Sequence, residues 1–248
     1  MLSTRLKGAG GAGRPLLEFI GHAYARSTTN NDTITFDSPS VTILSGDLLV
    51  FSGFWDDGST GIKSVSAAVS GGWAAPTAIQ PMVSGSEYPK GGSFYKIAQQ
   101  TNPTIYITNT DDGYTDATDT LAGACMIFRP SQPIGSITVG TKASSNGPSA
   151  LSNTIGAQTP ATVAADTVYV FGNFVCGRPM STSVQNPTTT YTQSGWTHVD
   201  GDGNRSGVDD MDYGYKLMVT DETSVSEQVD VTDAGHQAQI LFALKVGF

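Results

Sequence analysis

The sequence predicts an all-β protein of two tandem antiparallel β-sandwiches, jelly-roll or immunoglobulin-like, preceded by an extended N-terminal arm. Ordered landmarks occur twice, at a near-constant shift of about 120 residues, and indicate an internal duplication. Short apolar or alternating runs recur between clusters of Gly, Asn, Asp and Pro, as is typical of sandwich strands. Long segments with a 3.6-residue period are absent from the sequence, which argues against crossover helices and a parallel sheet.

The duplication rests on four landmarks that keep their order in both copies. The first copy contains Gly46–Phe51, Gly72-Trp73, Phe94–Ile97 and Ala124–Phe128, and the second contains Ala165–Phe171, Gly195-Trp196, Gly214–Leu217 and Gln239–Ala243. Each copy has a size at which a domain can bury its own core. We therefore expect two sandwich domains, over residues 17–130 and 134–248, with a short linker at residues 131–133.

The first element, residues 1–16, is a basic arm that is too rich in glycine to pack a core. Such a segment is flexible in isolation. We expect it to gain order by binding a neighbouring subunit, with folding back onto its own domain as the alternative. The residues expected to make this contact are Arg5, Lys7, Gly8, Gly10, Gly11, Gly13 and Arg14.

The first domain is expected to be a series of short strands. Residues 48–51 form a continuous apolar run, typical of a strand in a sandwich interior. Residues 104–108 alternate, which predicts one wet and one dry face, and residues 122–128 close the copy as another buried strand. The second domain repeats the pattern at 136–139, 168–171, 228–231 and 240–246.

The connection between the two copies contains Pro130 and Pro133. Two prolines so close together make a chain segment short and stiff. The two domains are therefore expected to keep a fixed relation, which suits a spacer or an assembly unit better than a hinged clamp.

The formal net charge is −9 and is unevenly distributed. The arm is positive, whereas residues 15–132 and 133–248 each hold five basic and eleven acidic residues. Acidic bodies bind nucleic acid poorly, because phosphate contacts need clustered Lys and Arg. The sequence also shows neither an apolar run of membrane-spanning length nor an apolar leader after Met1. We expect a protein made in a cytoplasm, without nucleic-acid or membrane partners.

Cys125 and Cys176 lie in apolar runs of different copies and are expected to be buried thiols, with a bridge between the copies as the alternative. His22, His198 and His236 lack the paired spacing of zinc ligands. They are expected to be surface histidines or hydrogen-bonded histidines of the sandwiches.

The most oxygen-rich segment contains Asp200, Asp202 and Asn204, which match the opening of a calcium-binding loop. Arg205 then stands where that loop needs glycine, and Met211 where it needs a bidentate carboxylate. A solvated loop is favoured, and an irregular calcium site is the alternative. The sequence indicates no other metal and no cofactor.

No pattern in the sequence selects a catalytic centre. The carboxylates Asp56, Asp57 and Glu87 lack a spacing that would place two of them across a cleft. Neither a nucleophile elbow nor a phosphate-binding loop is present in the sequence. The sequence therefore predicts a protein that is not an enzyme.

Trp73 and Trp196 follow glycine at equivalent points of the two copies. This favours side chains that plug the sandwich core over exposed platforms on which a ligand could stack. Trp55 ends a strand, has no counterpart, and is the candidate for stacking a ligand. Lys96 and Lys216 each follow a tyrosine in an apolar strand, so alternation puts Tyr and Lys on opposite faces. Each lysine is expected to point outward, or to snorkel from the inner face, and to serve at the surface.

These landmarks also resemble a known module. The residues that carry the resemblance are Gly46–Phe51, Gly72-Trp73, Tyr95–Ala98 and Met126–Arg129. This series is similar to a β-sandwich module of tailed-bacteriophage virion proteins and phage-derived open reading frames. The second copy departs from it, since Ala165 replaces the turn glycine, Met218 replaces the alanine and the final arginine is lost. The resemblance implies a structural part and carries no catalytic residues.

Together these observations predict a non-enzymatic virion structural protein, synthesised in the host cytoplasm. A head decoration or minor capsid protein that stabilises the capsid lattice is favoured, with the arm as its anchor. A tail or fibre component and a carbohydrate-binding module are the alternatives. The expected partners are the major capsid protein or tail proteins, and the chain is expected to be a homo-oligomer or lattice-bound.

Overall fold

The computed structural model describes residues 15–27, 33–39, 41–55, 65–69, 77–83, 90–109, 121–147, 150–155, 166–178, 188–199, 210–218, 227–232 and 236–248. Within these stretches the chain forms strands and irregular connections without a helix. Every strand pair among them is antiparallel. The all-β class and the antiparallel pairing predicted from the sequence are confirmed.

Eight of the described strands belong to the first half of the chain and eight to the second half. The first eight are β1 (Leu17–Ser27), β2 (Thr33–Thr35), β3 (Leu48–Trp55), β4 (Val65–Val69), β5 (Thr77–Val83), β6 (Lys90–Ile97), β7 (Ile105–Asn109) and β8 (Leu121–Pro130). The second eight are β9 (Ser136–Gly147), β10 (Leu151–Ile155), β11 (Thr167–Arg178), β12 (Thr188–Tyr191), β13 (Trp196–His198), β14 (Asp210–Met218), β15 (Glu227–Thr232) and β16 (His236–Gly247).

The two halves have the same strand order. The first half forms a five-stranded sheet, β1-β8-β3-β6-β5, and a three-stranded sheet, β2-β7-β4. The second half forms β9-β16-β11-β14-β13 and β10-β15-β12. If strands are counted from the start of each half, both large sheets read 1-8-3-6-5 and both small sheets read 2-7-4. We call these the first and second large sheets and the first and second small sheets.

The correspondence extends to the register of individual residues. Lys96 of β6 lies opposite Leu49, and Lys216 of β14 lies opposite Phe171. The edge strands β1 and β9 both contain a register shift, at Phe19–Gly21 in β1 and opposite Phe242–Leu244 in β9. A bulge at the same place in both edge strands bends each strand alike.

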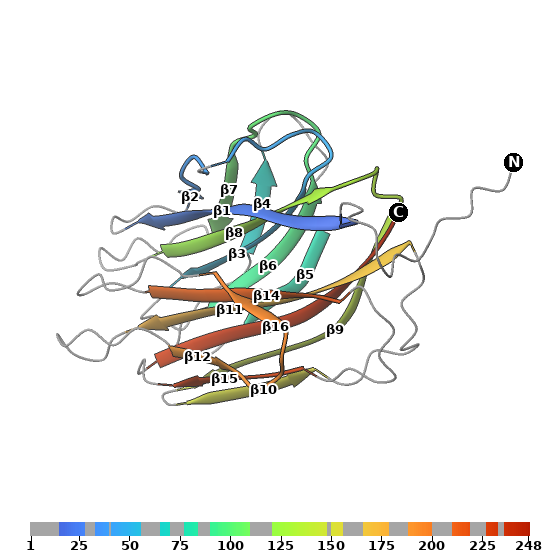
Figure 1. The fold of residues 1–248 in the computed structure, drawn as a ribbon. Helices are drawn as coiled ribbons and strands as arrows, with labels where there is room; N and C mark the ends of the chain where they lie inside the picture. Colours follow the sequence, from blue (N-terminus) through green and yellow to red (C-terminus); the bar gives the residue numbers. More distant parts are fainter. Residues whose placement is uncertain are drawn as a thin grey trace, which may run out of the picture.

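The four sheets are stacked as four layers (Figure 1), with the two large sheets in the middle and a small sheet outside each of them. The largest apolar cluster joins the two large sheets and defines the central layer. A second cluster fills the first inner layer, between the first large and first small sheets. Two smaller clusters lie in the second inner layer, between the second large and second small sheets.

The sequence explains why a large sheet can be covered on both faces. Leu48, Leu49, Val50 and Phe51 of β3 are all fully buried, as the continuous apolar run predicted. Alternation sends Leu48 and Val50 into the central layer, and Leu49 and Phe51 into the first inner layer. Burying a side chain of this size contributes roughly 1.5–3 kcal/mol to folding, so each face of such a strand stabilises a different layer.

The central layer joins the halves through aromatic and polar contacts as well as aliphatic ones. Phe19 of β1 stacks on Tyr215 of β14 with ring centroids 4.7 Å apart. His22 hydrogen-bonds the hydroxyl of Tyr213 through Nδ1. At the position of β9 that matches His22, Lys142 donates from Nζ to the carbonyl oxygen of Ile79 at 2.9 Å. Each edge strand therefore reaches across to the other half.

The two buried lysines correct a sequence-based expectation. Lys96 and Lys216 are each only 8% exposed, so a surface role for them is wrong. Tyr95 and Tyr215 do lie on the opposite face, against the central layer. The face of each large sheet that carries the lysine is also buried, because a small sheet packs on it. The alternation of residues along the strand does not show that a second sheet covers this face.

The connection from β8 to β9 is short and attached to the first half. The amide of Ser131 donates to the carbonyl oxygen of Leu16 at 2.9 Å. Because the central cluster draws side chains from both large sheets, the two halves meet through a buried apolar core. The expected boundaries at residues 17–130, 131–133 and 134–248 remain a prediction.

Candidate functional site

Most residues that the sequence singled out lie outside the described part of the chain. This applies to the arm residues Arg5, Lys7, Gly8, Gly10, Gly11, Gly13 and Arg14, to Asp200, Asp202 and Asn204, and to Asp56, Asp57, Trp73 and Glu87. The backbone of Trp55 ends β3 opposite Lys90 and Leu121. The predictions made for these residues stay predictions.

The cysteines and two of the histidines are described. Cys125 and Cys176 are not joined in a disulfide and are fully buried, which confirms the expectation of buried thiols. Burial raises the pKa of the Cys125 thiol well above its ordinary range, so the thiol stays protonated. His22 and His198 are hydrogen-bonded histidines, as expected.

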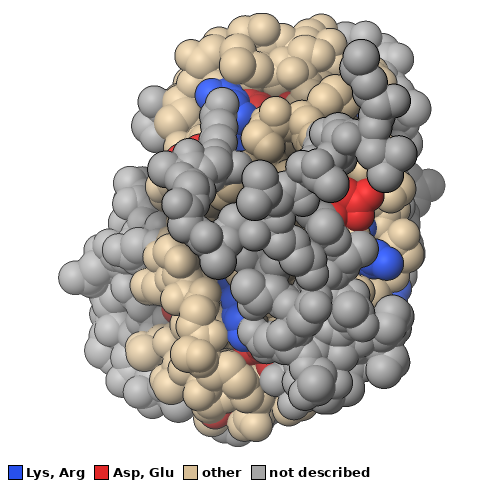
Figure 2. Space-filling view, turned by 45° about the vertical axis from the view of Figure 1, so that its right-hand side comes forward, with Lys and Arg blue, Asp and Glu red and all other residues tan. Residues whose placement is uncertain are grey.

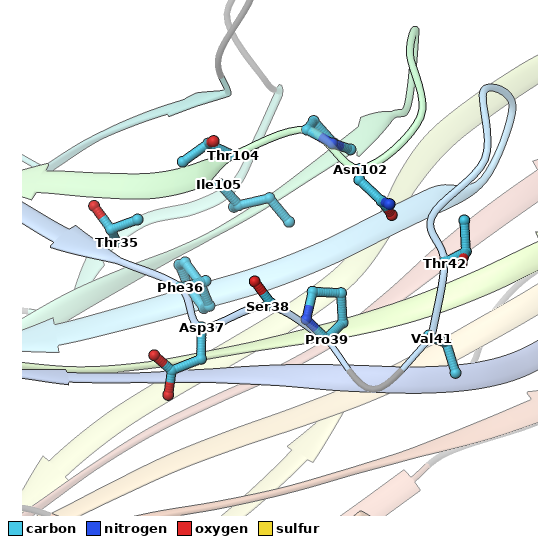
Figure 3. Close-up of a pocket in the computed structure, with 11 residues that line it drawn as sticks. Thr35, Phe36, Asp37, Ser38, Pro39, Val41, Thr42, Asn102, Thr104 and Ile105 are labelled. Carbon is cyan, nitrogen blue, oxygen red and sulfur yellow. The ribbon is translucent and has the colours of Figure 1, made fainter.

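An open pocket lies where the first inner layer reaches the surface (Figure 3), and we call it the end pocket. It has a volume of about 430 Å³. Its walls come from the end of β2, the irregular segment that leads toward β3, and the residues just before β7. The floor is apolar, because Phe36, Pro103 and Ile105 are buried there.

Polar groups form the rim of the end pocket. Hydroxyl groups come from Thr35, Ser38, Thr42 and Thr104, and Asp37 adds one carboxylate. In Figure 3 the Ser38 hydroxyl and the Asn102 amide point into the space above Pro39, whereas the Asp37 carboxylate points away from it. The pocket thus combines an apolar floor with neutral hydrogen-bonding groups.

Backbone hydrogen bonds fix the walls of the end pocket. The amide of Phe36 donates to Ile105 O, and the amide of Asp37 donates to Tyr24 O, both at 2.9 Å. Asn102 and Ile43 are bonded twice, since Ile43 N donates to Asn102 Oδ1 at 2.9 Å and Asn102 N donates to Ile43 O at 3.0 Å. Asn102 has a φ of 45°, a left-handed conformation that asparagine tolerates better than most residues.

An ion pair fixes the end of the irregular segment that leads from β2 to β3. Arg129 donates to both carboxylate oxygens of Asp47, from Nε at 3.0 Å and from Nη2 at 2.7 Å. Nη2 also donates to the carbonyl oxygen of Thr42 at 2.7 Å, next to the pocket. The hydrogen bonds to Asp47 raise the pKa of Arg129, so the guanidinium remains charged. Arg129 thereby ties β8 to the pocket wall.

The second inner layer contains a buried ionic cluster. Lys216 of β14 donates from Nζ to Glu227 Oε1 of β15 at 2.5 Å, and both side chains are buried. Trp196 donates its indole N–H to the other oxygen, Oε2, at 2.8 Å. Trp196 also stacks on Tyr191, with ring centroids 4.6 Å apart. Trp196 is therefore a half-buried, hydrogen-bonded side chain at the edge of the layer, and not an exposed platform.

A second ionic contact lies beside this cluster. His198 of β13 pairs through Nε2 with Asp212 Oδ1 of β14, and Asp212 Oδ2 accepts the amide of Thr189 at 3.0 Å. Asp212 thus links the second large sheet to β12 of the second small sheet. Burial raises the pKa of Tyr191 above its ordinary range, and the charge of Asp212 raises it further.

Amide side chains complete the polar core of the second inner layer. Asn153 Nδ2 donates to Ser145 Oγ at 2.7 Å and to Gln239 Oε1 at 2.8 Å. Gln239 Nε2 donates to Asn173 Oδ1 at 2.8 Å. This chain of hydrogen bonds runs from β9 through β10 and β16 to β11. The Gln-Ala-Gln series at 237–239, which sets two amides on one face of an apolar strand, is the sequence signal that could have indicated it.

Several buried polar atoms near this chain have no direct partner among the described residues. They are Asn173 Nδ2, Thr189 Oγ1, Gln237 Nε2 and Gln237 Oε1, and the Tyr191 hydroxyl lies beside Asn173 without a well-formed hydrogen bond. Buried polar groups of this kind are usually satisfied by ordered water.

The described residues form neither a cluster of metal-binding side chains nor, on the face drawn in Figure 2, a surface patch of one charge. Within the described stretches, no group of three or more His, Cys, Asp or Glu residues lies close enough together to hold a metal ion. On the face drawn in Figure 2, blue and red atoms are scattered among tan ones, without a patch of one sign among the described residues. Among the described residues the fold also has no helix that is long and apolar enough to cross a bilayer.

Comparisons with known proteins give no assignment: no family model, no curated protein and no solved structure matches this chain.

Proposed function

We propose that this chain is a non-enzymatic structural protein of a tailed-bacteriophage virion, built by internal duplication of one β-sandwich module. The identical strand order of the two halves supports the duplication. The matching bulges in β1 and β9 and the matching lysines Lys96 and Lys216 support it further. A shared topology reached twice along one chain is most simply explained by copying.

The observation that carries the structural role is the central layer. Two large sheets buried against each other leave no hinge between the halves, because separating them would expose the largest apolar cluster of the molecule. Close-packed interiors have low compressibility and transmit strain. Such a block can bridge neighbouring subunits and resist a mechanical load, which is the task of a lattice-stabilising part.

We propose a head decoration or minor capsid role, with the N-terminal arm as the anchor. Glycines in the arm permit close approach of its backbone to a groove of the lattice, and Arg5, Lys7 and Arg14 supply three cations that an acidic lattice surface would attract. The duplicated body then lies outside the lattice. A tail or fibre location uses the same anchor and is the second form of this proposal.

The test is attachment to particles that have been assembled without this chain. Full-length protein is expected to co-sediment with particles, and a variant lacking residues 1–14 is expected to stay in the supernatant with an unchanged melting temperature. A triple variant, Arg5→Gln, Lys7→Gln and Arg14→Gln, separates charge from backbone contact. Lys245→Gln removes a cation from the body and is the matched control. Equal occupancy for the deleted and full-length chains would reject the anchoring mechanism.

Location in a reconstructed virion then separates the two forms of the proposal. Density for the four-layered body on the head is expected for a decoration protein. Density on the tail would assign the second form, and absence of the chain from purified virions would reject both.

A further inference from the structure

We propose that the end pocket binds a neutral saccharide, a function separate from attachment to the lattice. The pocket is the opening of about 430 Å³ described above, beside β2 and β7 (Figure 3). Sites for small molecules commonly have volumes of roughly 300–1,000 Å³. The end pocket is at the small end of this range and suits one or two sugar rings.

The charge of the lining excludes the other common ligand classes. Among the described residues that line the pocket there is no Lys, Arg or His, and the nearby Arg129 is already paired with Asp47, so an anion such as phosphate would meet no free cation from them. A hard divalent metal ion needs several oxygen ligands, usually more than one carboxylate. Asp37 is the single carboxylate among the described lining residues, and it points away from the space in Figure 3. A lipid chain needs a deep apolar slot, whereas this pocket is open and its rim is polar.

The remaining chemistry matches that of a sugar ring. A neutral saccharide presents hydroxyl groups that donate and accept hydrogen bonds, together with an apolar face of C–H groups. Ser38 and Thr42 offer hydroxyls, and Asn102 offers its amide Nδ2. Neither hydroxyl is bonded to another residue of the described stretches. Pro39 and the buried Ile105 supply apolar surface beneath them.

The pocket is also formed before any ligand arrives. The paired bonds between Asn102 and Ile43 and the contact from Arg129 to Thr42 O fix two of its walls. A preformed site avoids the cost of ordering loops on binding. Because the pocket is open and offers few hydrogen bonds, we expect a weak affinity, with a Kd on the order of 1 mM.

The test uses the purified full-length chain and titrations followed by NMR. The neutral probes are glucose, galactose, mannose and N-acetylglucosamine, and the anionic probes are sialic acid and inorganic phosphate. At least one neutral sugar is expected to bind, and the anions are expected to bind more weakly or not at all.

Two substitutions place the site. Ser38→Ala removes one rim hydroxyl, and Asn102→Asp removes the free N–H groups while it keeps the oxygen that accepts Ile43 N. Each is expected to weaken the sugar affinity about tenfold, the effect of one lost hydrogen bond. The control is Thr154→Ala, because Thr154 is exposed like the rim residue Thr35 and lies in β10, the strand that corresponds to β2. Thr154→Ala is expected to leave binding unchanged.

Three results would overturn the proposal. The first is that no neutral sugar binds. The second is that a sugar binds equally well to Ser38→Ala, Asn102→Asp and the parent chain, with all three folded by circular dichroism. The third is that phosphate or sialic acid binds more tightly than every neutral sugar. None of these results affects the particle-attachment test, so failure of either proposal can be recognised separately.

Discussion

The two inner layers share one topology but differ in chemistry. The first inner layer is filled by an apolar cluster beside the buried Lys96, and in that cluster Phe51 and Phe94 pack with ring centroids 5.8 Å apart. At the matching positions the second large sheet has Asn173 and Gly214, and the Tyr191 hydroxyl fills the space above Gly214. One strand order therefore tolerates an apolar or a polar core, provided that the side chains of the facing sheets fill the space between them.

The largest effect is expected at the ion pair of the polar layer. Glu227→Ala leaves the Lys216 ammonium buried without its carboxylate and also removes the acceptor of the Trp196 indole N–H. Loss of one partner of a buried pair costs about 3–5 kcal/mol. Urea denaturation is expected to show that decrease in the free energy of unfolding.

An apolar replacement of the whole pair is the informative control. Because desolvation opposes a buried ion pair, the double variant Lys216→Met, Glu227→Leu is expected to recover most of the lost stability. If Glu227→Ala cost less than about 1 kcal/mol, the polar layer would not depend on this pair.

The next effect concerns a difference in volume between matching positions of the central layer. Gly172 lies opposite Phe242, whereas Val50 lies opposite Met126 at the same place in the first half. A Cβ on Gly172 would lie 2.2 Å from the Phe242 ring, so Gly172→Ala is expected to cost about 1–3 kcal/mol by overpacking.

Phe242→Met recreates the pairing of the first half and should relieve this clash. In a double-mutant cycle measured by thermal unfolding, the two substitutions together are expected to cost less than the sum of their separate effects. If the two costs were strictly additive, the destabilisation by Gly172→Ala would not come from contact with the Phe242 ring.

A smaller effect is expected from the chain of amides. Gln239→Leu removes the acceptor of one Asn153 bond and the donor to Asn173 Oδ1. Unsatisfied buried groups oppose the gain from extra apolar burial, so a net loss of about 1–2 kcal/mol is expected by urea denaturation. The triple variant Asn153→Leu, Asn173→Leu, Gln239→Leu, which imitates the apolar first layer, is expected to be more stable than Gln239→Leu alone. A single variant as stable as the parent would contradict this account.

The smallest effect at neutral pH is expected for Tyr191→Phe. Burial raises the pKa of Tyr191, so its contribution is fully present below the unfolded value of about 10 and is lost as the pH rises further. Parent and variant are expected to match at pH 7, whereas above pH 10 the parent loses up to about 1.4 kcal/mol more per pH unit. Stability measured from pH 7 to pH 11.5 checks this, and parallel curves would contradict it. The buried Cys125 thiol affects both proteins equally.

Particular residues show what the sequence can and cannot predict here. Repeated landmarks and the apolar run at Leu48–Phe51 predict a β fold with deeply buried strands, because strand periodicity is local. Periodicity cannot show what covers each face, so the burial of Lys96 and Lys216 was missed. The pairing of Lys216 with Glu227 depends on which sheets pack together, and the end pocket depends on where an irregular segment is tied down. Neither the ion pair nor the pocket corresponds to a pattern of neighbouring residues in the sequence.

The central claim is that the two halves behave as one rigid block joined through the central layer. Hydrogen exchange measured with increasing denaturant tests it most directly, by comparing the interior strands β3 and β8 with β11 and β16. The account predicts that all four strands open together, with the same free energy and the same denaturant dependence. Opening of β11 and β16 while β3 and β8 stay protected would contradict it.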